Sequence, residues 1–76
     1  MFDRIIFDPQ IMGGRACIRG MRIPVSQVVN LVANGMTVEE ILKEYPTLEA
    51  GDVRQALQYA ASLATEEIHP LTGSRP

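Results

Sequence analysis

The chain has little of what builds several common kinds of protein site. It has one cysteine and one histidine among 76 residues, which excludes a disulfide framework and a zinc cluster. It has no tryptophan, and aromatic residues make up only 5%. No apolar run is long enough to cross a bilayer, and the start, "MFDRIIFDPQ", does not resemble a signal peptide. We therefore expect a cytoplasmic protein without a membrane segment, a metal or a cofactor.

The chain also lacks an excess of positive charge. Seven lysines and arginines face nine acidic residues, which gives a net charge of −2 at pH 7 and rules out a basic protein that coats nucleic acid. DNA binding would need positive charge concentrated on one face. We expect a single domain over residues 1–76 with a small core, and domains of this size often rely on self-association. A homodimer is therefore the expected state.

Catalytic side chains are scarce as well. The only thiol is Cys17, and the only histidine, His69, lies in a tail containing proline, glycine and serine. A reactive cysteine needs a nearby base or a lowered pKa, whereas a cysteine in an apolar strand is usually a small buried hydrophobe. We predict that Cys17 is buried and that the protein is not an enzyme.

What the chain does contain begins with signals for β structure. The apolar run "RIIF", residues 4–7, ends at an Asp-Pro turn signal, and a glycine pair at residues 13–14 predicts a second turn. In "ACIRGMRI", residues 16–23, Gly20-Met21 suits a two-residue hairpin turn. That register places Ile18 opposite Ile23 on one face of the hairpin. Residues 4–23 are therefore predicted to form a β segment.

Three helical patterns follow over residues 24–66. Pro24 suits a helix start, valines 25, 28, 29 and 32 share one face, and Asn34-Gly35 ends this first helix. The pair Thr37 and Glu40 forms a capping box for a second helix. Its apolar stripe is Val38, Ile41, Leu42 and Tyr45, and Pro46 stops it. The third helix is predicted from about Ala50 to Glu66, with the stripe Val53, Ala56, Leu57, Ala60 and Ala64. Residues 67–76 are expected to be a flexible tail.

The resulting fold class is mainly α: a three-helix domain with a short N-terminal β-strand or hairpin. A short helix, a tight turn and a longer helix in succession are typical of a helix-turn-helix unit.

Three arginines, Arg15, Arg19 and Arg22, are candidates for binding a partner or a phosphate. The predicted hairpin places Arg19 opposite Arg22, and like charges directly opposite one another are destabilising. This cost indicates a compensating anion, which could be the protein's own Asp3 or Asp8, DNA phosphate, or a carboxylate on a bound protein. The alternative is that both arginines pair locally or extend into water.

The outer side of the third helix offers candidates for reading DNA. Arginine pairs with guanine and glutamine with adenine in the major groove, and Arg54, Gln55 and Gln58 lie on or beside this side. The alternative is an ordinary solvated face. Against DNA binding, Glu49 and Asp52 make the helix start acidic, which would repel phosphate.

Several of these motifs occur together and in order in one known family. "GGRACIRGMRIPV" followed by "GMTVEEILKEYPTLEAGDVRQALQYA" resembles domain-of-unknown-function family 433, from about Arg4 to Ala61. One departure is Glu49, where the family usually has threonine or serine, which are better N-caps. The resemblance implies a homeodomain-like three-helix fold and similarity to VapB-type antitoxins. Such antitoxins are often encoded beside a PIN-like ribonuclease toxin, which carries an acidic metal site.

Two functions follow as expectations. The first is an antitoxin-like regulatory protein that binds operator DNA as a dimer and neutralises a PIN-like ribonuclease. The alternative is a protein–protein interaction module that does not bind DNA, which the pI of about 5.2 and the acidic helix start favour. A small enzyme using Cys17 is the third and least supported hypothesis.

Overall fold

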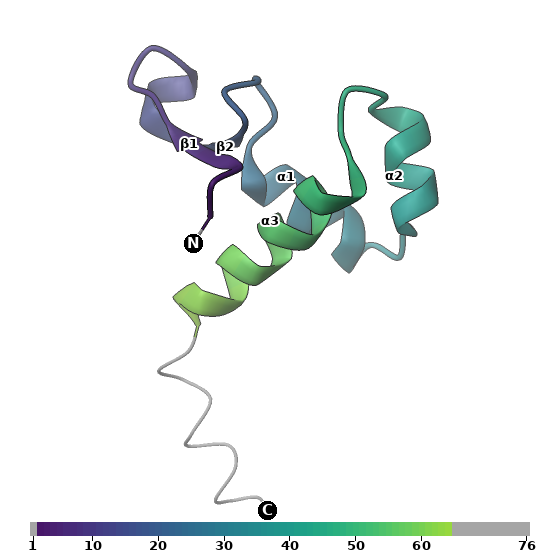
Figure 1. The fold of residues 1–76 in the computed structure, drawn as a ribbon. Coiled ribbons are helices and arrows are strands. Elements are labelled where there is room, and N and C mark those ends of the chain that lie inside the picture. Colours follow the sequence, from purple (N-terminus) through teal and green to yellow (C-terminus); the bar gives the residue numbers. More distant parts are fainter. Residues whose placement is uncertain (1, 65–76) are drawn as a thin grey trace, which may run out of the picture.

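The protein folds into two short strands followed by three α-helices (Figure 1). The computed structural model describes residues 2–64. The elements are β1 (Ile5–Phe7), a 3-10 turn (Met12–Gly14), β2 (Ala16–Ile18), α1 (Val25–Ala33), α2 (Val38–Glu44) and α3 (Ala50–Leu63). The mainly helical class is therefore confirmed, and α3 ends three residues before its predicted end at Glu66. The predicted tail, residues 67–76, lies outside the described residues.

The two strands form an antiparallel two-stranded sheet. Ile5 lies opposite Ile18, and Phe7 lies opposite Ala16. The sequence predicted a separate hairpin within residues 16–23 instead of this pairing. Its register is right at two positions, since Cys17 forms a bridge with Pro24 and the Ile18 amide donates to the Ile23 carbonyl at 3.0 Å, but it does not extend to Arg19. The pairing with residues 23 and 24 stays limited to these contacts, because the chain turns away directly after Ile18 and Pro24 has no amide hydrogen to donate.

The turn after β2 differs from the prediction. Its central residues are Arg19 and Gly20, with φ of 48° and 79°, and the Met21 amide closes it by donating to the Ile18 carbonyl at 2.8 Å. The predicted turn at Gly20-Met21 and the predicted face-to-face placement of Arg19 and Arg22 are therefore wrong. A left-handed conformation is uncommon for a residue other than glycine. Arg19 keeps it while its side chain is held by distant partners, which are described below.

The helix boundaries follow local signals. α1 begins directly after Pro24, and Gly35 follows its end with φ of 94°. The capping box is present at α2: the Thr37 amide donates to the Glu40 carboxylate at 2.8 Å, and the Glu40 amide donates to Thr37 Oγ1 at 3.1 Å. These predicted starts and stops are confirmed.

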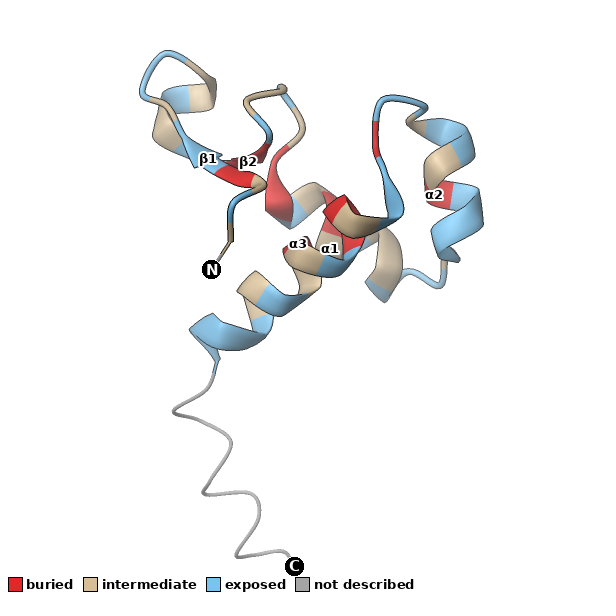
Figure 2. Ribbon diagram, in the orientation of Figure 1, coloured by how far each residue is buried: buried red, intermediate tan, exposed pale blue. Residues whose placement is uncertain are grey.

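One hydrophobic core joins the sheet to all three helices (Figure 2). Its buried members are Ile5, Ile18, Val25, Val28, Ile41, Leu48, Val53 and Ala56. Cys17 is 1% exposed, as predicted. Val38 was predicted to belong to the apolar stripe of α2, but it lies at the helix start and is 39% exposed. α2 therefore contributes a single fully buried side chain, Ile41.

Candidate functional site

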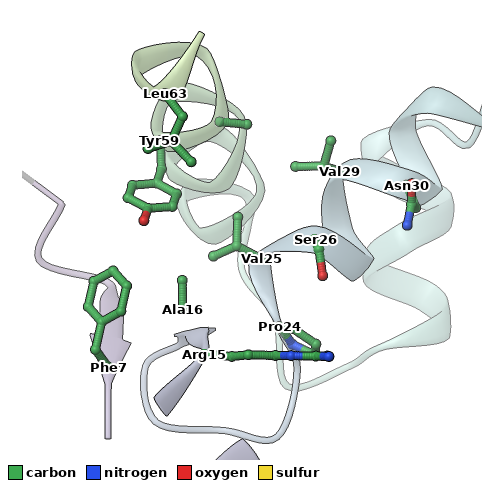
Figure 3. A pocket seen from close by; sticks show the side chains of 11 residues that line it. Phe7, Arg15, Ala16, Pro24, Val25, Ser26, Val29, Asn30, Tyr59 and Leu63 are labelled. Atoms are coloured by element: carbon green, nitrogen blue, oxygen red, sulfur yellow. The ribbon is translucent and has the colours of Figure 1, made fainter. Parts of the chain in front are cut away.

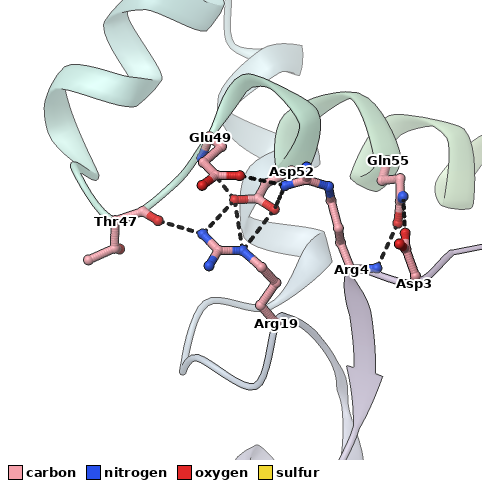
Figure 4. A network of polar contacts seen from close by, with 7 residues as sticks. All are labelled: Asp3, Arg4, Arg19, Thr47, Glu49, Asp52 and Gln55. Carbon is pink, nitrogen blue, oxygen red and sulfur yellow. Dashed lines mark hydrogen bonds and ion pairs between the residues drawn. The ribbon is translucent and has the colours of Figure 1, made fainter.

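The start of α3 carries a buried carboxylate that two arginines hold (Figure 4). Asp52 has no exposed surface. Its Oδ1 accepts from Arg4 Nη1 at 2.8 Å, and its Oδ2 accepts from Arg19 Nη2 at 2.9 Å. Oδ2 also accepts from the Glu49 amide at 2.8 Å, which caps the helix. We call Arg4, Arg19, Glu49 and Asp52 the Asp52 clasp, because together they join β1 and the turn after β2 to α3.

The charges of the clasp compensate one another. Burial by itself would raise the pKa of Asp52, but the hydrogen bonds from Arg19 and then from Arg4 outweigh burial, so the pKa lies below its usual value. The hydrogen bonds with Glu49 and Asp52 raise the pKa of Arg4 in turn. The sequence predicted that an acidic start of α3 would repel phosphate. The structure buries Asp52 and pairs both acids with arginines, so their charges are locally compensated. Repulsion of phosphate itself stays a prediction.

A glycine makes room for this arrangement. A Cβ atom at position 51 would lie 2.9 Å from Arg4 Cζ, which is closer than real Cβ contacts come. Glycine weakens the first turn of a helix relative to alanine. Gly51 is thus explained by the Arg4 guanidinium, which lies directly against the start of α3.

Gln55 is engaged within the molecule. Its Oε1 accepts from the Arg4 amide at 2.9 Å, and its Nε2 donates to Asp3 Oδ1 at 2.6 Å. The hydrogen bond from Gln55 is the main cause of a lowered pKa at Asp3. Of the three residues predicted to read DNA bases, Arg54 and Gln58 remain exposed, one helical turn apart on α3.

The three arginines predicted to bind a partner or phosphate divide into two kinds. Arg19 is bound inside the protein, by Asp52 and by the Thr47 carbonyl at 2.7 Å. The carboxylate that it meets is Asp52, not the predicted Asp3 or Asp8. Arg15 and Arg22 are exposed, and neither side chain has a hydrogen bond or an ion pair with any residue in the range 2–64. The structure does not bring these three arginines together into one site.

The opposite charge is concentrated on α2. Glu39, Glu40 and Glu44 are exposed there, with Lys43 among them. The unengaged positive charges of the β segment and the acidic surface of α2 therefore belong to different elements.

An apolar groove lies between the β segment, the start of α1 and the end of α3 (Figure 3). Its volume is about 620 Å³, and its lining residues are Phe7, Arg15, Ala16, Pro24, Val25, Ser26, Val29, Asn30, Tyr59, Ala60 and Leu63. The rings of Phe7 and Tyr59 meet edge to face with centroids 6.0 Å apart. Phe7 and Leu63 remain 57% and 62% exposed. The sequence analysis missed this groove, because its walls come from three segments far apart in the chain.

Other kinds of site find no support in the part of the chain that the structure describes. No group of three histidine, cysteine or acidic side chains within residues 2–64 could hold a metal ion. No helix of this part combines the length and the hydropathy that a membrane span requires. The buried position of Cys17 fits the predicted structural role, and His69 lies outside the described residues.

Comparison with known proteins supports the family resemblance that the sequence motifs indicated. A family model described as "Protein of unknown function (DUF433)" matches residues 5–60. The uncharacterized protein y4eO of Sinorhizobium fredii (strain NBRC 101917 / NGR234) is 42% identical over 67 residues, which cover 88% of this chain and 28% of that protein. The crystal structure of a DUF433 member protein from Anabaena variabilis ATCC 29413 is similar with a TM-score of 0.72 and 33% identity, over 95% of this chain and 70% of that chain. The chain thus spans just over a quarter of the length of y4eO. On the matched residues and this shared structure, the chain belongs to the DUF433 family.

Proposed function

We propose that this domain is an antitoxin-like regulatory module that neutralises a PIN-like ribonuclease by direct binding. The observation that carries the proposal is the pair of exposed arginines, Arg15 and Arg22, which have no partner within residues 2–64. A guanidinium binds a carboxylate with two parallel hydrogen bonds, so arginines suit an acidic metal site. In this proposal, Arg15 and Arg22 meet the carboxylates that hold the metal of the ribonuclease.

The distribution of charge favours a protein partner over DNA. α2 presents three exposed glutamates, and it would lie nearest the DNA backbone if α2 and α3 acted as a helix-turn-helix. The two arginines of the Asp52 clasp are occupied by carboxylates and add no free charge to the start of α3. An acidic protein surface, by contrast, complements the free arginines of the β segment.

The test uses the PIN-like ribonuclease that the proposal places beside the gene of this protein. Its cleavage of RNA is measured with increasing amounts of the domain. We expect Arg15→Glu and Arg22→Glu to weaken inhibition by roughly tenfold or more each, because charge reversal sets a carboxylate against a carboxylate. The matched control is Arg54→Glu on α3, which is expected to inhibit like the wild type. Unchanged inhibition by both β-segment variants, or an equal loss with Arg54→Glu, would contradict the proposal.

Operator DNA is a second candidate ligand. It rests on the outward placement of Arg54 and Gln58, one turn apart on the longer helix of a helix pair joined by a short turn. In this proposal, α2 and α3 act as a homeodomain-like helix-turn-helix, and these two side chains contact base edges in the major groove.

A gel-shift titration with the protein's own promoter tests DNA binding. We expect the double variant Arg54→Ala, Gln58→Ala to bind at least about tenfold more weakly, since each bidentate base contact contributes about 1–3 kcal/mol. Affinity should also fall steeply with salt, because phosphate contacts release counterions. The control is Arg22→Ala, which removes one positive charge from the turn after β2 and lies outside the groove that α3 lines. An equal loss with this control would reject base reading, and absence of a shift with the wild type would reject DNA binding.

A further inference from the structure

We propose that Arg19 is a positioning residue: through its bonds to the start of α3, it fixes the turn that presents Arg22 to the partner. The inference rests on the proposed function, because it concerns how one of the two partner-binding arginines is held in place. It also gives these two arginines different roles. Arg22 follows the turn that Arg19 holds, whereas Arg15 lies at the opposite end of β2.

Arg19 has a backbone conformation that is unfavourable for its residue type. With φ of 48° at Arg19 and 79° at Gly20, both central residues of the turn are left-handed, as in a type I′ turn. Asparagine, aspartate and glycine are the usual residues at the first of these positions, and a bulkier side chain is strained there. Such strain persists only where the surroundings hold the residue in place. The side chain of Arg19 is therefore expected to have a role that offsets the strain.

The side chain of Arg19 ties the turn to α3 (Figure 4). Its Nε donates to Asp52 Oδ1 at 3.1 Å, and its Nη2 donates to Asp52 Oδ2 at 2.9 Å and to the Thr47 carbonyl at 2.7 Å. Two bonds from one guanidinium to one carboxylate fix its orientation as well as its distance. The carboxylate is itself held, because Asp52 is fully buried and also accepts from Arg4 and the Glu49 amide. The turn is thus fixed relative to α3.

The path from this turn to Arg22 is short. The Met21 amide closes the turn by donating to the Ile18 carbonyl at 2.8 Å, and Arg22 comes directly after Met21. Met21 and Ile23 pack against the core on either side of Arg22, which is exposed. This packing directs Arg22 outward, and the bonds of Arg19 determine where the turn lies against α3. An arginine that is held in place in advance loses less conformational entropy when it binds.

The experiment separates the bonds of Arg19 from the turn itself. Arg19→Asn supplies a residue that a type I′ turn prefers but removes the guanidinium that reaches Asp52. We expect the backbone NMR order parameters of residues 20–22 to fall from about 0.85 towards about 0.6 in this variant, and those of residues 15–16 to stay unchanged. Should Arg19→Asn not fold, Arg19→Lys is measured instead, since it keeps the charge without the paired bonds.

The matched control is Arg4→Gln. It removes the other arginine that pairs with Asp52 and leaves the bonds of Arg19 in place. Residues 20–22 should therefore stay rigid in this variant, even if the domain becomes less stable. Circular dichroism establishes that each variant is folded.

Inhibition of the ribonuclease gives a second readout, which a merely structural role would not move. We expect Arg19→Asn to weaken inhibition by roughly fivefold, the effect of one long side chain that must be ordered on binding. Arg22→Glu should cause a smaller further loss in Arg19→Asn than in the wild type, because its position is no longer fixed. Arg15→Glu should cause the same loss in both backgrounds.

Three results would overturn the inference. One is unchanged order in residues 20–22 of Arg19→Asn, which would show that the turn is rigid by itself. Another is an equal loss of order in Arg4→Gln, which would assign the effect to general destabilisation. The third is an undiminished effect of Arg22→Glu in the Arg19→Asn background. Failure of the proposed function is distinguishable, because it would appear as a wild-type domain that does not inhibit, while the order parameters still decide whether Arg19 fixes the turn.

Discussion

Replacing Asp52 by asparagine is expected to lower the free energy of unfolding by about 2–3 kcal/mol. The substitution keeps the size of the side chain but removes the charge that Arg4 and Arg19 share. Breaking a fully buried ion pair typically costs more than this. The smaller figure applies because the Arg4 and Arg19 side chains remain 32% and 37% exposed and can recover part of their hydration. For a domain of marginal stability, this loss is a large fraction of the total.

The pH dependence of stability should show that the loss in Asp52→Asn comes from the missing charge of Asp52. The pKa of Asp52 is lower in the folded protein than in the unfolded chain. Its contribution to stability is therefore complete above the unfolded-state pKa of about 4 and is lost as the pH falls through the lower folded-state value. We expect the wild type to lose stability in this acidic range more steeply than Asp52→Asn.

Urea unfolding followed by circular dichroism, at pH 7 and at steps below pH 4, measures both effects. The matched control is Glu49→Gln, which removes the exposed carboxylate that also pairs with Arg4. Exposed ion pairs contribute little, so the stability of this variant should change hardly at all. Equal stability of Asp52→Asn and the wild type at pH 7 would show that the clasp does not stabilise the fold.

Shortening Ile41 to alanine is expected to cost about 3 kcal/mol. Ile41 has no exposed surface and is the only fully buried side chain of α2. Removing it deletes apolar contact with the core and leaves a cavity, and α2 has only seven residues to compensate for the loss. A helix of this length has no stability of its own in water. We therefore expect α2 to separate from the core more readily than α1 or α3.

Two measurements separate a global from a local effect. Urea unfolding gives the loss of free energy, and amide hydrogen exchange shows where protection falls first. In Ile41→Ala, protection should fall most in residues 41–45, whose amides bond within α2. The control is Val38→Ala at the exposed start of α2, which should be nearly neutral. Uniform loss of protection across all three helices would show that α2 unfolds only together with the whole domain.

The helices could be predicted from the sequence because their signals are local. The capping box at Thr37, the stop at Pro46 and Gly35 after α1 each act over one helical turn. The pairing of β1 with β2 could not be predicted in this way. Three-residue strands carry little periodicity, and the chosen partner depends on packing against α1 and α3. The hairpin predicted within residues 16–23 was a reasonable local alternative, and the structure retains its register at one bridge, between Cys17 and Pro24.

The candidate site was less predictable than the fold. Arg15 and Arg22 could be named as candidates from the sequence alone. That Arg19 pairs with Asp52 could not be predicted in this way, because the contact spans 33 residues. One signal was available: Asp52 lies one turn before Ala56 on α3, at the edge of the buried stripe. An acid in that position needs a cationic partner, and Gly51 beside it indicates that another group approaches closely.

The Asp52 clasp also has a consequence for the rates of folding and unfolding. Arg4 contacts Asp52 across 48 residues, so the clasp closes a loop that contains most of the domain. We expect a contact of such long range to form after the local elements that it connects, because closing so long a loop costs chain entropy. An interaction that is absent from the transition state slows unfolding and hardly changes the folding rate. The Asp52 clasp should therefore raise the barrier to unfolding. Its loss in Asp52→Asn should increase the unfolding rate and leave the folding rate nearly unchanged.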